Sequence, residues 1–371
     1  MMVRNLNDKF DSKVVCALKG IAIILMVCNH LYPIPEWIFP SNQYISLQVG
    51  AKTLASYWGG FSKICVAIFA FLSGIGMYYT YKKKKSIVGG YKYNLNKLRG
   101  FLTTYWLILI LFYLPIMSIS GVLQFKISDF ILNLFAIRTS YIRIAWYVRY
   151  YIILVASFPI YMFALKNKSY NAIGITIRVV LLLVLGVVKV GLSFLESGSV
   201  ILEMLREYVD YTPIVLLGYY FGEVNAYERF FAKMKKIRLL NNLFAEMIVF
   251  AFVFLARGAV KDIVLFKADI LYTPVIVYIL WRFIVRYCGL CYELMSLLGK
   301  YSLEIWFLHA IFFIGSESVQ KIAYWPKYSV LILPWTLCIL LPVAVMFQKV
   351  KALLTNLELC FSEKIHLLKK L

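Results

Sequence analysis

The chain has 371 residues, of which 62% are hydrophobic and only 16% are charged, and its mean hydropathy is +0.77. Soluble domains carry about 25% charged residues, so this composition excludes an ordinary soluble protein. The net charge of +22 does not indicate a nucleic-acid partner, because membrane proteins retain Lys and Arg on cytoplasmic loops beside anionic lipid.

Apolar runs of about 20 residues recur along the whole chain, which predicts an all-α, polytopic membrane protein with about ten transmembrane helices in one bundle. We expect residues 1–348 to form this membrane domain. The predicted spans are residues 14–31, 61–81, 101–120, 144–165, 177–195, 208–224, 241–257, 268–286, 297–315 and 328–348.

The first predicted span carries two ionisable side chains, Lys19 and His30. A charged side chain inside a span costs about 2.5–3.5 kcal/mol or more, so each needs a reason to be there. The two positions are eleven residues apart, which places both on one face of a helix, about 16 Å apart along its axis. An imidazole can take a proton from a hydroxyl near neutral pH, so His30 is the candidate base, with Asn29 beside it.

Lys and Arg are concentrated after the second and sixth spans, at Lys82, Lys83, Lys84 and Lys85 and again within residues 229–238. Acidic residues are concentrated instead in residues 196–210. The positive-inside rule therefore predicts that both basic loops and both chain termini face the cytoplasm. Abundant Lys, Ile, Tyr and Asn suit an AT-rich bacterial genome, so we expect a bacterial cytoplasmic membrane.

Later spans contain further polar residues: Arg149, Lys189, Glu246, Glu304 and His309. Cations gathered around one base suit an anionic substrate or cofactor, whereas ion pairs that only support the structure are the alternative. We expect Asn29, Arg149, Glu304 and His309 to support His30. Glu246 and Glu304 are the candidate carboxylate partners of lysines or arginines that lie deep in a span.

The remaining features predict no metal site and a membrane-bound tail. Cys288 and Cys291 form a single C-x-x-C, without the second pair or the nearby histidines that zinc requires. Residues 349–371 mix leucines with lysines, which predicts an amphipathic helix on the inner membrane face.

Four segments together resemble the integral-membrane acyltransferase 3 family. The first is Lys19, ten residues and His30, where the family has an arginine, ten residues and a histidine. The others are residues 71–74 (FLSG), 145–149 (AWYVR) and 299–309 (GKYSLEIWFLH). They stand in the family's order, and the likeness extends from residue 14 to about residue 348.

The resemblance implies an O-acyltransferase that moves an acyl group, expected to be acetyl, from cytoplasmic acetyl-CoA to a hydroxyl. The acceptor would be a surface polysaccharide or its lipid-linked precursor, and His30 would be the essential base or a transient acyl carrier. The basic loop from Lys82 to Arg99, in which Lys82–Lys85 are followed by Lys92, Lys97 and Arg99, could attract the phosphates of CoA. Charges that only set topology and face lipid are the alternative explanation of the same run.

Two departures from the family keep alternatives open. Lys19 retains the charge of the family's arginine but loses its planar, bidentate fork, and the chain has no Arg-x-x-Arg motif. One alternative is a transporter or flippase of an anionic lipid-linked sugar. The other is a catalytically silent relative of the enzymes.

Overall fold

The computed structural model describes residues 9–32, 35–84, 86–165, 172–196, 198–234, 242–260, 266–287 and 289–368, and these residues are predominantly helical. Within them, the only strands are β1 (Gln48–Val49) and β2 (Lys52–Thr53), an antiparallel hairpin in the loop after the first helix. The first helices are α1 (Ser12–Leu31), α2 (Leu54–Ser62), α3 (Cys65–Tyr81), α4 (Ile87–Ile108), α5 (Leu114–Ile119), α6 (Ile127–Leu134), α7 (Trp146–Leu165) and α8 (Ala172–Ser193).

The second half of the chain continues the same pattern. Its helices are α9 (Val200–Glu223), α10 (Ala226–Met234), α11 (Leu243–Ala259), α12 (Asp269–Tyr287), α13 (Gly289–Lys300), α14 (Ser302–His309), α15 (Glu317–Tyr324) and α16 (Ser329–Leu368).

Each predicted span overlaps a helix of the structure. In the described part of the chain, six helical segments are long and apolar enough to cross a membrane: Ser12–Leu31, Leu54–Tyr81, Ile87–Ile119, Arg143–Met162, Gly174–Ser193 and Ser329–Asn356. The all-α membrane class is therefore confirmed, whereas the number of ten spans stays a prediction.

Several predicted spans differ from the helices that form. The third predicted span begins at residue 101, but the helix there, α4, begins at Ile87, because Ser86 caps its N-terminus by accepting a hydrogen bond from the amide of Gly89 (3.1 Å). The prediction of one helix over residues 297–315 is wrong, since α13 ends at Lys300 and α14 begins at Ser302. Hydropathy averages side chains and does not detect a change of backbone direction within an apolar run.

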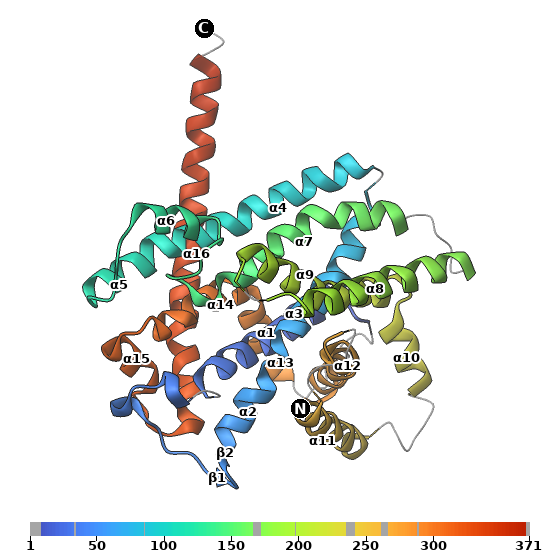
Figure 1. Ribbon diagram of the computed structural model, residues 1–371, viewed down its shortest axis with the longest axis horizontal. Helices are drawn as coiled ribbons and strands as arrows, with labels where there is room; N and C mark the ends of the chain where they lie inside the picture. Colours follow the sequence, from blue (N-terminus) through green and yellow to red (C-terminus); the bar gives the residue numbers. More distant parts are fainter. Residues whose placement is uncertain are drawn as a thin grey trace.

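The last helix, α16, runs from Ser329 to Leu368 without interruption, and its final turns extend beyond the other helices (Figure 1). No break separates the predicted tail, residues 349–371, from the last predicted span. That this tail lies on the inner membrane face stays a prediction.

Glycines allow the closest helix crossings of the bundle. A Cβ atom on Gly20 of α1 would lie 1.9 Å from the carbonyl oxygen of Met295, and one on Gly299 of α13 would lie 1.8 Å from that of Cys16. Gly74 of α3 and Gly218 of α9 are equally close to the facing helix backbone. Small residues of this kind let helix backbones touch, which is how helices associate tightly in lipid.

These crossings place α1 in the interior of the bundle, in contact with α2, α3, α13 and α14 (Figure 1). The face of α1 that carries Lys19, Asn29 and His30 remains only partly covered by its neighbours. The residues singled out in the first span therefore face a space inside the protein.

Candidate active-site cavity

A cavity of about 460 Å³ adjoins this face of α1. Residues of α1, α3, α4, α7, α9, α14 and α16 line it, together with Lys63 from the junction between α2 and α3. Such a volume is within the range of small-molecule and cofactor sites. Helices from both halves of the sequence thus enclose one site.

All four sequence segments that carry the family resemblance reach this cavity. Lys19, Asn29 and His30 line it from α1 and Ser73 lines it from α3. The later segments contribute side chains that include Trp146 from α7 and Trp306 from α14. Segments that are weak signals separately are thus brought together by the fold.

One end of the cavity is rich in lysine. Lys97 of α4 lies near enough to Lys19 for their charges to interact, and its Nζ atom is 5.9 Å from the centre of the Tyr151 ring. Lys351 of α16 donates a hydrogen bond to the carbonyl oxygen of Gly100 (3.0 Å), one turn from Lys97. We call Lys19, Lys97 and Lys351 the cavity lysines.

The cavity lysines have no carboxylate partner within salt-bridge distance among the described residues, and no acidic side chain lines the cavity there. Three lysines without a salt-bridge partner in a low-dielectric interior favour an anionic ligand, although Glu304 is near enough to Lys351 for their charges to interact. A ligand with phosphate groups has the chemistry that this end of the cavity can bind.

The other end holds two histidines. The rings of His30 and His309 are 5.0 Å apart between centroids, and His309 is fully buried. The Nδ1 atom of His309 lies 2.6 Å from the carbonyl oxygen of Trp306. A carbonyl oxygen can only accept, so Nδ1 carries the proton and Nε2 presents a lone pair. In the described structure, Nε2 has no hydrogen-bond partner.

Arg149, a predicted supporting residue, and Lys189, a further cation of the predicted spans, form ion pairs instead. Arg149 donates to Glu207 (2.5 and 2.9 Å) and to Glu203 (3.0 Å), and it is absent from the cavity lining. Lys189 pairs with Asp210 at 3.4 Å. The alternative that the sequence left open, ion pairs that support the structure, therefore describes these two cations.

The two candidate carboxylates differ in whether they meet a cation. Glu246 forms a salt bridge with Arg282 at 2.5 Å, so it is the partner of a buried arginine, as predicted. Glu304 is buried in α14 and accepts a hydrogen bond from Gln348 (3.2 Å), without a salt bridge to Lys19. Apolar spans show that a partner is needed but not which helix supplies it.

The Lys82–Lys84 part of the basic loop lies apart from the cavity, whereas Lys97 of the same predicted loop lines it. Lys82 and Lys84 have their Nζ atoms 5.6 and 5.1 Å from the rings of Tyr78 and Tyr93, and neither these lysines nor Lys83 lines the cavity. Lys85 lies outside the described residues. In the described part of the chain, no group of three or more His, Cys, Asp or Glu side chains could hold a metal ion.

Two cations of the cavity lining, Lys63 and Lys351, are not among the candidates that the sequence offers, whereas Lys97 belongs to the basic loop for which CoA capture was predicted. A signal existed for Lys63, because it is the one charged residue within the predicted span 61–81. The free-energy cost of a charged side chain inside a span, which draws attention to Lys19, applies equally to Lys63. Lys351 lies among other basic residues near a span end, where nothing in the sequence distinguishes it.

Comparison with known protein families matches residues 15–347 to the acyltransferase domain of the acyltransferase 3 family. The match covers all four segments and every residue that lines the cavity except Lys351. Comparisons with curated proteins and with solved structures find no match.

Proposed function

The chain belongs to the acyltransferase 3 family, and from this premise we propose that it is an O-acetyltransferase that uses cytoplasmic acetyl-CoA. The acceptor is a hydroxyl of a cell-surface polysaccharide or of its lipid-linked precursor. The protein acts in the bacterial cytoplasmic membrane, with both termini in the cytoplasm.

The proposal rests on one observation: the two ends of a single cavity carry different chemical groups, lysines at one end and histidines at the other. The cavity lysines, which have no salt-bridge partner among the described residues, lie at one end of the cavity. The candidate base His30 lies about 16 Å from Lys19 along the same helix. The nucleotide and pyrophosphate of CoA are anionic, so they suit the lysine end. The thioester at the far end of the pantetheine arm would then lie toward His30.

The chemistry proposed for His30 is general base catalysis. Its imidazole takes the proton of the acceptor hydroxyl while the hydroxyl oxygen attacks the thioester carbonyl, and the proton then passes to the departing CoA sulfur. His309 would orient His30, since its Nε2 lone pair belongs to a buried ring 5.0 Å away. A transient acyl group on His30 is the variant of this mechanism that also fits the resemblance.

Release of free CoA tests the activity directly. Purified protein in lipid nanodiscs receives acetyl-CoA and a panel of bacterial glycans, and the thiol of CoA is measured over time. The proposal predicts acceptor-dependent release that is lost in His30→Ala. Absence of release across the panel, together with movement of a lipid-linked sugar between leaflets, would favour the transporter.

The orientation has its own test. A reporter enzyme that is active only outside the cytoplasm, fused after residue 90, should give no signal, whereas the same reporter near Gly50 should be active. The opposite pattern would place His30 at the cytoplasmic side and contradict the proposed path of the donor.

A further inference from the structure

The helix that faces α1 is broken next to His30. α2 ends at Ser62 and α3 begins at Cys65, so Lys63 and Ile64 lie between two helices within one apolar segment, Leu54–Tyr81. Backbone groups freed by a break inside a membrane need partners from the protein. A break that persists there is therefore held by specific contacts.

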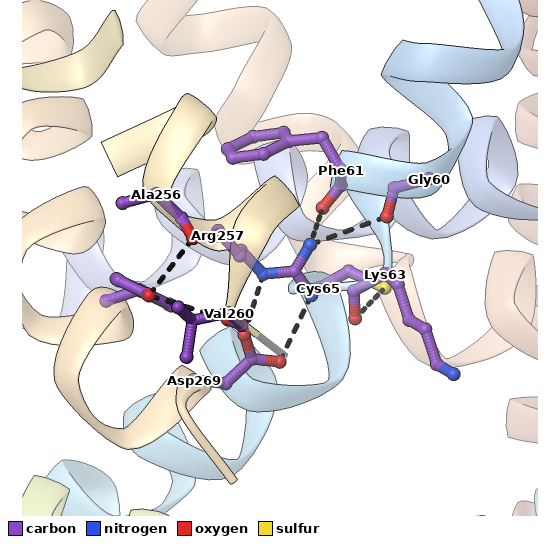
Figure 2. A network of polar contacts seen from close by, with 9 residues as sticks. Gly60, Phe61, Lys63, Cys65, Ala256, Arg257, Val260 and Asp269 are labelled. Atoms are coloured by element: carbon purple, nitrogen blue, oxygen red, sulfur yellow. Dashed lines mark hydrogen bonds and ion pairs between the residues drawn. The ribbon is translucent and has the colours of Figure 1, made fainter. Parts of the chain in front are cut away.

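Arg257 of α11 supplies these contacts (Figure 2). Its Nη1 atom donates to the carbonyl oxygens of Phe61 (2.8 Å) and Gly60 (3.4 Å), the last turn of α2. Its Nε and Nη2 atoms donate to the two carboxylate oxygens of Asp269 on α12, at 2.6 and 3.1 Å. Both oxygens of Asp269 are thus engaged by Arg257, and the bidentate pair fixes the end of α2.

The anchored break directs Lys63 into the cavity. Figure 2 shows the Lys63 side chain extending away from the Arg257–Asp269 pair, and the side chain lines the cavity together with His30 and Asn29. Its charge lies near enough to His30 to interact with the ring. Lys63 also remains exposed within the cavity, so it is accessible to a bound substrate.

The proposed reaction develops negative charge at this end of the cavity. As the acceptor oxygen bonds to the thioester carbon, the carbonyl π electrons move to the carbonyl oxygen and form an oxyanion. When the oxyanion collapses, the C–S bond breaks and the CoA sulfur leaves with the proton that His30 carried. A cation or donor aimed at the oxyanion stabilises the transition state more than the ground state.

We propose that Lys63 is a catalytic residue that stabilises this oxyanion, positioned by the helix break that Arg257 and Asp269 hold. This inference rests on the proposed acetyl transfer. The cavity lysines are assigned to the donor phosphates at the other end, and Arg257 is engaged by carbonyls and a carboxylate. Lys63 is the cation that the described residues place in the cavity lining beside His30.

The test compares Lys63→Met, Lys63→Gln and Lys63→Arg with the wild type in nanodiscs. Lys52→Met is the matched control, because Lys52 is an exposed lysine of β2 outside the cavity. The thiol of CoA is measured with acetyl-CoA alone, where water replaces the acceptor, and with a glycan acceptor. Affinity for CoA itself is measured separately by calorimetry.

Both neutral variants should lower kcat about 10²–10³-fold in the two reactions, as loss of one oxyanion donor does elsewhere. Their affinity for CoA should stay near that of the wild type, and Lys63→Arg should retain most of the activity. Two neutral variants are used so that a folding defect in one does not decide the result.

Three outcomes would overturn the role of Lys63 while leaving acetyl transfer intact. They are a normal kcat in the folded neutral variants, a raised KM for the glycan alone, and a Lys63→Arg variant as slow as Lys63→Met. An inactive wild type would instead overturn the proposed function.

Discussion

Two sets of cations lie inside this bundle, and they differ in what neutralises them. Arg149, Arg178 and Arg282 are buried and each is in a salt bridge with a carboxylate, at 2.5 to 3.0 Å. We call these the paired arginines. The cavity lysines, Lys19, Lys97 and Lys351, have no such partner among the described residues.

The contrast teaches how charge is divided between structure and function. A guanidinium presents a planar fork that matches a carboxylate, so arginine suits permanent ion pairs within the fold. A lysine carries a point charge on a flexible stem, and one without a counter-ion inside the protein is available to an anionic ligand. Lys19, which stands where the family has arginine, belongs to the second set.

Replacement of His30 should have the largest effect on activity, and it should lower the rate of acyl transfer without lowering the stability of the protein. His30→Ala is expected to lower kcat by about 10²–10⁴-fold, the usual contribution of a positioned base. The midpoint of thermal unfolding in detergent should remain close to that of the wild type. Full activity in folded His30→Ala would contradict the proposed mechanism.

Arg149→Met tests the paired arginines. Removal of one partner leaves Glu203 and Glu207 without their cation, which should lower the free energy of unfolding by about 3–5 kcal/mol. Thermal unfolding measures this loss, and Arg149→Met combined with Glu207→Gln should recover part of it. Unchanged stability with a raised KM for acetyl-CoA would instead assign Arg149 to the donor.

The cavity lysines should respond in the opposite way. Lys97→Met and Lys351→Met are each expected to raise the dissociation constant of CoA about tenfold or more, since a hydrogen bond to a charged group contributes about 1.5–3 kcal/mol. The stability of Lys97→Met should be equal to or above that of the wild type, because a charge without a salt-bridge partner is removed. Calorimetry with CoA and a thermal unfolding curve measure the two quantities.

Lys19→Arg tests whether the CoA site depends on the shape of the cation as well as on its charge. Arginine at this position should keep or improve CoA affinity, because the guanidinium can bind a phosphate through two hydrogen bonds. Lys19→Met should weaken binding as the other two variants do. Weaker binding in Lys19→Arg would show that the cavity is shaped for lysine.

The Lys82–Lys84 part of the basic loop should show the smallest effect. Replacement of Lys82, Lys83 and Lys84 by Gln should raise the KM for acetyl-CoA less than about fivefold, because exposed charges contribute about 1 kcal/mol or less. Any increase should shrink as salt is added, since these side chains lie outside the cavity. A large increase that persists at high salt would make the loop part of the donor site.

Much of the fold followed from patterns local to the chain. Apolar runs predicted the membrane class, and the spacing of Lys19 and His30 predicted a shared helix face, because both depend only on neighbouring residues and helix geometry. The four family segments were also visible in order. The residues within these segments nevertheless have different roles. Gly20, Gly74 and Gly299 allow helix crossings, whereas Ser73 and Trp306 line the cavity.

What the tertiary structure decided was the partner of each charge. Arg149 and Lys97 are both cations in or near predicted spans. Arg149 meets two glutamates of α9, whereas Lys97 lies near Lys19 in the cavity lining. The break at Lys63 likewise depends on Arg257, nearly two hundred residues later in the chain. A hydropathy profile records that a charge is costly at a given depth, but the compensating group lies on a helix that only packing brings near.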